Sequence, residues 1–195
     1  MFFVLTINQD HLIHPVFLIY LYIKNMYTVL ITLVVIIYVF IKWFFRKPVR
    51  ISQLPQDVIV SPADGTVMNA EGRNVSIFLD ILNVHHQYIP IDSRVKSIEI
   101  ITGKYKMAFT PESVHNHGVK IVFITALGEL EVTQRVGFIA RRIVEFVKPG
   151  DNVKRGEVYG LIKFGSRVDI VLPLGMTTTL KKGDKVKAGL TPIAM

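Results

Sequence analysis

The feature that most constrains the fold is an apolar run near the N-terminus, which contains no charged residue from position 25 to position 41. Lys24 precedes the run and Lys42 follows it, and the aromatic residues 43–45 extend its apolar character. A helix of about 20 mainly apolar residues is long enough to cross the hydrocarbon core of a bilayer. The run therefore predicts one membrane-spanning helix over residues 26–45, with aromatic side chains near the interface.

An earlier apolar stretch, residues 15–23, is too short to span a bilayer alone, and is either an interfacial helix or an extension of the same helix. A cleaved signal or transit peptide is the alternative interpretation of the N-terminal segment. The length of the run, the lack of a small-residue cleavage site and the basic residues after it favour a retained single-pass anchor. Because Lys42, Arg46, Lys47 and Arg50 follow the run, the positive-inside rule places the rest of the chain on the cytoplasmic side, or on the matrix side in an organelle.

The composition outside this run is that of an ordinary globular domain. The formal net charge is +8, but the basic residues are scattered, which does not indicate a nucleic-acid-binding surface. The absence of cysteine excludes disulfides, thiolate nucleophiles and cysteine-ligated zinc. We expect an N-terminal membrane anchor over residues 1–45, a polar linker with two prolines over residues 46–57, and one domain over residues 58–195.

The pattern of the domain is that of many short strands. Runs rich in Val, Ile, Phe and Thr alternate with Gly, Pro, Asn and Asp, and amphipathic helical patterns of ten or more residues are missing. The sequence therefore predicts a mainly β fold, α+β at most, in the form of a compact sandwich or barrel-sandwich. Residues 135–151 fit either a short helix or a strand. The expected strands lie within residues 58–70, 74–81, 95–103, 120–136 and 162–173.

An internal repeat supports this fold class. Residues 147–156 and 180–189 share the pattern KxGDxVxxG, in which the Gly-Asp pair suits a tight turn. The pattern resembles turns of lipoyl- and biotinyl-type barrel-sandwich domains, but the lysine motif of a carrier domain is missing. The repeat is therefore evidence for the fold and says little about activity.

The pair Gly165-Ser166 lies between apolar runs, where a glycine is also compatible with an ordinary turn or a strand bulge. The chemical interpretation is cleavage of the backbone by the serine hydroxyl, which attacks the preceding carbonyl with help from a base. Elimination from the resulting ester leaves a dehydroalanine, which hydrolyses to an N-terminal pyruvoyl group. Such a group can form a Schiff base with a substrate amine and withdraw electrons, as pyridoxal phosphate does elsewhere.

Five segments together resemble the short form of the phosphatidylserine decarboxylase family, and the resemblance covers roughly residues 44 to 194. The stretch around FGSRVD is the specific one, whereas the other four are weak when taken singly. The segments are FFRKPVR (44–50), VSPADG (60–65), NVHHQYIP (83–90), IARRIVEFVKPGDNVKRGEVYGLIKFGSRVDIVLP (139–173) and LKKGDKVKAG (180–189).

The resemblance implies cleavage between Gly165 and Ser166, which would give a β chain of residues 1–165 and an α chain of residues 166–195. Ser166 would become the pyruvoyl group, so that no pyridoxal phosphate is needed. Asp64 matches the family's motif acid and would help to activate Ser166, directly or through a histidine. His85 matches the first motif histidine and is the candidate general acid–base group.

The sequence also departs from the family pattern. Tyr88 stands where longer members carry a second histidine and short ones usually a basic residue, and a tyrosine is a poor base near neutral pH. Arg167 and Tyr88 are candidates for substrate contacts. His85 and His86 are adjacent in a strand-like run, so one is expected to face inward and the other outward. His115 and His117 alternate on an expected strand, but a pair without a third ligand predicts no metal site.

The function implied is decarboxylation of phosphatidylserine to phosphatidylethanolamine at a membrane, by a self-processed enzyme whose prosthetic group comes from Ser166. The expected partners are the phospholipid substrate, the membrane and the two chains of one precursor, with a homodimer left open and no nucleic acid. The alternative is a membrane-tethered, non-catalytic barrel-sandwich module, a degenerate decarboxylase. A third interpretation is a pyruvoyl enzyme that acts on a soluble amino acid.

Overall fold

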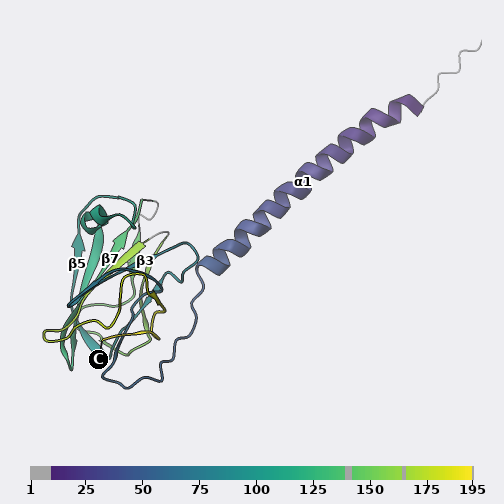
Figure 1. The fold of residues 1–195 in the computed structure, drawn as a ribbon. Helices are drawn as coiled ribbons and strands as arrows, with labels where there is room; N and C mark the ends of the chain where they lie inside the picture. Colours follow the sequence, from purple (N-terminus) through teal and green to yellow (C-terminus); the bar gives the residue numbers. More distant parts are fainter. Residues whose placement is uncertain (1–9, 139–141, 164–165, 195) are drawn as a thin grey trace, which may run out of the picture. The chain divides into compact units, whose positions relative to one another are not determined.

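The computed structural model describes residues 10–138, 142–163 and 166–194, which divide into one unit up to Trp43 and a second from Phe44 onward. The first unit contains the single helix α1 (Asp10–Phe44), which Figure 1 shows as one continuous element. Residues 15–23 therefore extend the same helix and do not form a separate interfacial one. The stretch Pro15–Phe44 has 30 residues with a mean hydropathy of 2.2, and by length and composition it could cross a membrane.

The apolar side chains of α1 point outward on all sides of the helix, and only 6% of its most apolar window is buried. Its threonine hydroxyls are bonded inside the helix, since Thr28 Oγ1 donates to Lys24 O and Thr32 Oγ1 donates to Thr28 O. At a rise of 1.5 Å per residue, 30 residues extend about 45 Å, which exceeds the roughly 30 Å of a hydrocarbon core. A helix of this kind suits an apolar surrounding such as lipid.

The second unit is built from short strands and one 3₁₀ helix. The elements are β1 (Ile59–Val60), β2 (Gly65–Glu71), β3 (Asn74–Leu79), β4 (His86–Tyr88), β5 (Ser93–Ile101), η1 (Pro111–His115), β6 (Gly118–Thr125), β7 (Gly128–Val136), β8 (Ile143–Glu145), β9 (Asn152–Val153), β10 (Val158–Ile162), β11 (Ser166–Val171), β12 (Lys185–Val186) and β13 (Pro192–Ala194).

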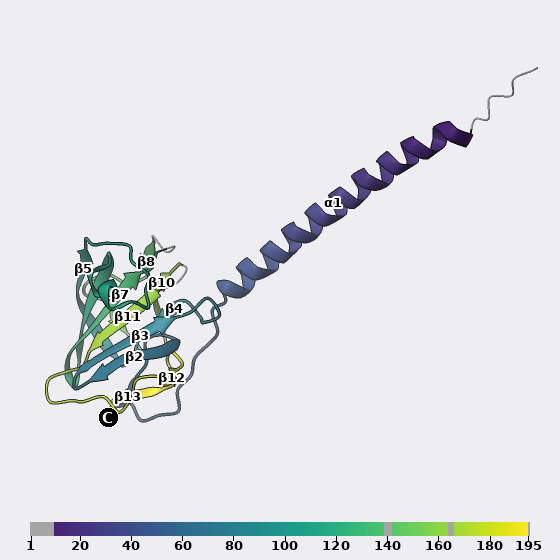
Figure 2. The ribbon, with the colours of Figure 1, turned by 45° about the horizontal axis from the view of Figure 1, so that its top comes forward.

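The strands form three antiparallel sheets. The largest has the order β12-β2-β3-β11-β7-β6-β5-β9, and Figure 2 shows β2, β3 and β11 as adjacent ribbons. The smaller sheets have the orders β4-β10-β8 and β1-β13. The predicted mainly β fold is confirmed. Within residues 135–151, the described part contains the strand β8 and no helix, while residues 139–141 lie outside the described residues.

The core of the domain lies between the sheets, and β11 contributes to it with strict alternation. Ser166, Val168 and Ile170 are buried, and the residues between them are partly exposed, as expected for a strand with one buried face. Large side chains from several strands fill the interior. The largest fully buried ones include Tyr88, Tyr159, Phe44, Phe123, Ile59, Ile77, Leu79, Ile121, Leu130 and Ile162.

The two repeats form equivalent turns, as predicted. Gly150 and Gly183 have φ angles of 97° and 96°, a left-handed conformation that glycine adopts without strain. In each turn the following aspartate accepts a hydrogen bond of 2.8 Å from the backbone N–H three residues earlier. The strands after the turns, β9 and β12, occupy the two opposite edges of the large sheet.

Candidate active site

Ser166 is the first residue of β11 and lies in the middle of the large sheet. It pairs with Leu79 at the end of β3 on one side and with Val136 at the end of β7 on the other. The residue is fully buried, and its Oγ has no hydrogen-bond partner among the described residues. A buried hydroxyl without a partner is costly, which is the property expected of a group that is kept for chemistry.

His85 immediately precedes β4 and is also fully buried. Its ring packs against the Phe44 ring at a tilt of 32°, with centroids 4.3 Å apart, and Nδ1 lies 3.0 Å from the carbonyl oxygen of Asn83. Burial lowers the pKa of His85 below its usual 6.5, so the imidazole is neutral near pH 7. Because a carbonyl oxygen only accepts, Nδ1 carries the proton, and Nε2 keeps its lone pair. Nε2 is buried without a partner in the described part of the chain, so it is available as a base.

A pair of buried glutamines links the histidine to the sheet that contains Ser166. Gln134 Nε2 on β7 donates to Gln87 Oε1 on β4 at 2.8 Å, and Gln87 Nε2 donates to the carbonyl of His85 at 2.7 Å. Ile162 N donates to that same carbonyl at 3.2 Å. These bonds therefore join His85 to β10 and to β7, the strand that pairs with β11, and Gln134 on β7 pairs with Val168 on β11. The sequence reasoning missed both glutamines, and no local motif distinguishes them.

Asp64 is buried, but its carboxylate faces other groups than Ser166 and His85. Arg50 NH2 lies 3.2 Å and 3.0 Å from the two carboxylate oxygens, and the backbone N–H of Ala188 donates to Oδ1 at 2.8 Å. Within the described residues, neither Ser166 nor His85 hydrogen-bonds to Asp64. Its role in activating Ser166 therefore stays a prediction, and its observed partner, Arg50, comes from the segment expected to be a simple linker.

Tyr88 lies directly beside this ion pair. The Arg50 guanidinium carbon is 5.7 Å from the centre of the Tyr88 ring, and the tyrosine hydroxyl donates to Pro48 O at 2.7 Å. Burial raises the pKa of Tyr88, so it stays a neutral hydrogen-bond donor. Arg50 thus brings a cation to the position where short family members usually carry a basic residue. A substrate contact by Tyr88 remains a prediction.

Arg167 is held in a polar network on the far side of β11 from the core. Its Nε donates to Asp169 Oδ1 at 2.6 Å, and its two terminal nitrogens donate to Ser113 and Ser76. Asp169 also pairs with Arg135 Nε at 2.7 Å. These bonds give Arg167 a structural role, and its expected contact with substrate stays untested.

Two expectations about histidines are wrong. His85 and His86 are both buried, because Phe44 packs on the first and Arg46 O lies 3.2 Å from Nδ1 of the second. Burial lowers the pKa of His86 as well. His115 lies in η1 and not on a strand, since Pro111 begins a 3₁₀ turn there. No group of three potential metal ligands occurs among the described residues.

The ion pair between Arg50 and Asp64 makes a testable contribution to stability. Replacing Arg50 with methionine should lower the free energy of unfolding by about 3 kcal/mol, because a buried carboxylate loses its charged partner. Thermal unfolding in detergent should then occur roughly 6–12 °C lower. The matched control is Lys47→Met, which removes an exposed cation from the same segment. Equal unfolding temperatures for the two variants would show that the pair does not stabilise the fold.

The buried hydroxyl of Ser166 has no partner among the described residues and stands at the start of a central strand. A site of this class is suited to attack by the hydroxyl on the adjacent backbone. Gly165, the other residue of the predicted cleavage site, lies outside the described residues. Comparison with known proteins identifies the family to which a site of this class belongs here. The family pattern described as phosphatidylserine decarboxylase matches residues 37–194.

Individual relatives agree with this match. A phosphatidylserine decarboxylase proenzyme of Streptomyces avermitilis is 44% identical over 77% of this chain and 72% of its own length. One of Chlorobium chlorochromatii is 40% identical over 84% and 82%. A putative archaetidylserine decarboxylase proenzyme of Methanococcoides burtonii is 42% identical over 80% and 74%. The chain belongs to the phosphatidylserine decarboxylase family.

Proposed function

We propose that this protein is a self-processing, pyruvoyl-dependent decarboxylase that converts phosphatidylserine to phosphatidylethanolamine. The observation that supports the proposal is that two buried atoms, Ser166 Oγ and His85 Nε2, have no hydrogen-bond partner among the described residues. The names of the relatives, which are decarboxylase proenzymes, support the same function.

In the proposed cleavage, His85 Nε2 accepts the proton of the Ser166 hydroxyl, and Oγ attacks the carbonyl carbon of residue 165. The peptide nitrogen leaves as the new ester forms, so the proton held by His85 can pass to it. The tautomer set by Asn83 O suits this step, because it leaves the lone pair on Nε2. Gln87 and Gln134 would hold His85 in place through its carbonyl group.

The residues around Ser166 also fit the prosthetic group that this cleavage would leave on the α chain. The group supplies an electron-withdrawing carbonyl that takes up the substrate amine. Its position at the start of β11 would be rigid, since six residues of that strand pair with β3 and with β7. The neutral His85 ring would remain beside it to hold or release a proton, and the apolar surroundings would exclude water.

The proposed setting is a membrane, with α1 as a single-pass anchor and the β domain on the cytoplasmic or matrix side. The support is the 30-residue apolar stretch and the basic residues that follow it. The alternative, a tethered module without catalysis, is not favoured, because the relatives are named as decarboxylase proenzymes.

The substrate is tested by supplying the purified, reconstituted full chain with phosphatidylserine labelled at the serine carboxyl group, or with equally labelled free serine. We expect labelled carbon dioxide and phosphatidylethanolamine from the lipid, and no release from free serine. Equal release from both would indicate an enzyme for a soluble amino acid. A full-length, uncleaved chain that releases nothing from either would indicate the non-catalytic module.

A further inference from the structure

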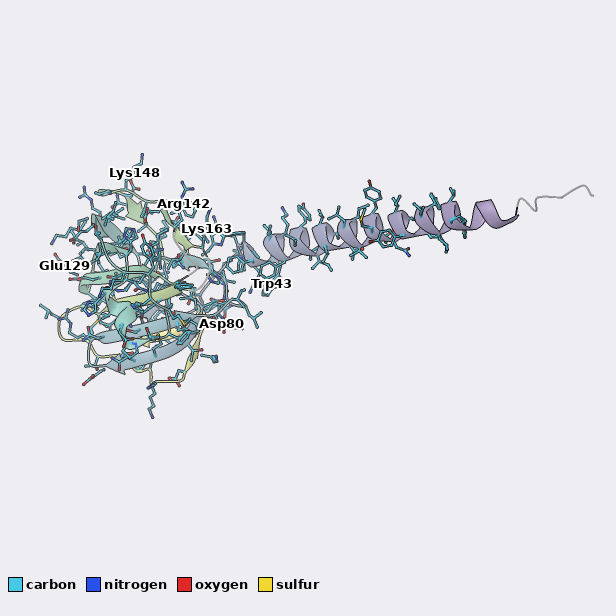
Figure 3. The ribbon with its side chains drawn as sticks, turned by 90° about the horizontal axis from the view of Figure 1, so that it is seen from above. Trp43, Asp80, Glu129, Arg142, Lys148 and Lys163 are labelled. Carbon is cyan, nitrogen blue, oxygen red and sulfur yellow. The ribbon has the colours of Figure 1, made fainter. Side chains whose placement is uncertain are left out.

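Several loops meet at the end of the β domain where Ser166 begins β11, here called the serine end. Strands β3 and β7 both end there, at Leu79 and Val136. The described loop segments at this end are residues 80–85 after β3, residues 102–117 before β6 and residues 137–138 after β7. Figure 3 shows Asp80 and Lys163 on this side of the domain, and Glu129, near the start of β7, on the opposite side.

Large apolar side chains are exposed on these loops, although nothing in the fold requires them there. Ile81 and Leu82 are 52% and 64% exposed, Met107 and Phe109 are 50% and 58% exposed, and Phe138 is 63% exposed. We call these five residues the apolar rim. Exposed apolar side chains that gather at one end of a domain commonly mark a surface that contacts a partner or a membrane.

The two main loops of the rim are fixed in place by hydrogen bonds. In residues 102–117, Asn116 Nδ2 donates to Lys106 O and to Val136 O, each at 2.8 Å. The Phe109 ring packs edge-on against Phe78 at 5.9 Å. The domain therefore presents the exposed side chains of this loop on an ordered backbone beside the end of β7.

The turn of residues 80–83 is equally ordered. Asp80 Oδ1 accepts hydrogen bonds from the backbone N–H groups of Leu82 and Asn83, at 2.8 Å and 3.2 Å. This leaves Ile81 and Leu82 exposed at the tip of the turn, with Leu82 three residues before His85. One loop thus follows Leu79 and the other is bonded to Val136, the two residues that pair with Ser166 on its opposite sides.

The charges around the rim are mainly positive. Lys104, Lys106 and Arg142 are exposed, and Lys163 is half-buried. The acidic residues on the same loops are Asp80, whose carboxylate caps its own turn, and Glu112. Exposed apolar groups flanked by lysine and arginine are typical of surfaces that enter the headgroup region of anionic bilayers.

We infer that the apolar rim inserts into the headgroup region of an anionic lipid bilayer and holds the serine end against the lipid. A second copy of the chain would also cover the rim, but it would bring like charges together, so lipid is favoured. The inference goes beyond the proposed function, because it assigns membrane contact to the β domain itself in addition to α1. The inference rests on the proposed function only where it explains what the contact achieves. The contact would bring a lipid headgroup to Ser166 without removing the lipid from the bilayer.

The chain has no cysteine, which allows a direct test in the full-length protein. Single cysteines are introduced as Phe109→Cys and Leu82→Cys, with Leu174→Cys as the matched control at the other end of the domain, where the leucine is 82% exposed. Each is labelled with an environment-sensitive dye, and the protein is reconstituted into vesicles of phosphatidylcholine and phosphatidylglycerol with brominated acyl chains. We expect bromine to quench the dye at both rim positions several-fold more than at position 174, and less when phosphatidylglycerol is omitted.

Quenching at the rim no stronger than at position 174 would overturn the inference. A second contradicting result would be protection of the rim dyes from both lipid bromine and iodide in the water, together with cross-links between two copies at position 109. That result would indicate that a second copy of the chain covers the rim. The same dyes are measured in a Ser166→Ala background, where cleavage and decarboxylation are absent. Quenching of the rim dyes in an unmodified Ser166 protein that does not decarboxylate lipid would support this inference and contradict the proposed function. Decarboxylation by the unmodified Ser166 protein without quenching of the rim dyes would do the reverse.

Discussion

Replacing Ser166 with alanine is expected to leave the chain intact and to abolish decarboxylation completely. The reason is that the Oγ atom is both the attacking group in cleavage and the source of the prosthetic group, so no other residue replaces it. Denaturing mass spectrometry should find fragments of residues 1–165 and 166–195 in the unmodified protein, the smaller with a blocked N-terminus. The Ser166→Ala variant should give only the full-length mass.

The matched control for this variant is Ser93→Ala. Ser93 also has a buried Oγ without a hydrogen-bond partner in the described part of the chain, but it lies on β5, which pairs with β6 and β9 and not with β11. Cleavage should therefore proceed normally in Ser93→Ala. If the unmodified protein itself stays intact under the same conditions, the proposal of self-processing is wrong.

Replacing His85 with glutamine is expected to slow cleavage by roughly 10²–10⁴-fold, the usual contribution of a general base. Glutamine keeps a polar side chain of similar reach but has no basic nitrogen. The control is His86→Gln, because His86 is also buried but its Nδ1 faces Arg46 O, and this variant should cleave at a near-normal rate. Equal rates for the two variants, followed as the appearance of the small fragment over time, would exclude His85 as the base.

The pH dependence provides a second measurement on His85. Since burial lowers its pKa below 6.5, the cleavage rate should stay level from neutral pH down to below 6.5 and fall only after the buried ring is protonated. The unfolded chain binds that proton more readily than the folded one, so the fold should lose stability as the pH falls below 6.5. His85→Gln should weaken this loss of stability in acid.

Sequence patterns predicted what depends on neighbours along the chain. The strand expected within residues 162–173 and the Gly-Asp turns at Gly150 and Gly183 are local signals, and both were confirmed. The pairing of Arg50 with Asp64 was not predicted, because the arginine belongs to a segment whose composition indicates only a polar linker. The segment in fact packs on the domain, where Arg155 donates to Leu54 O at 2.6 Å.

The sequence also predicted only part of the candidate site. Ser166 and His85 were named from the family motifs, and both are buried, while their catalytic roles stay predictions. The burial of His86 was missed because the period of two assumes that one face of a strand is open, whereas residues 44–46 cover it here. The two glutamines act through side chains that lie 47 residues apart in the chain, a relation that no local pattern contains.

The place of β11 in the large sheet has a consequence for how the enzyme would mature. Its first residue pairs with β3 on one side and β7 on the other, so Ser166 reaches its buried position only after all three strands have assembled. Activation is then a first-order event that happens once in the life of each molecule, at a rate independent of protein concentration. After cleavage, the α chain would still contribute β11 to the interior of the large sheet. It could therefore exchange with the α chain of another molecule only if the domain unfolded.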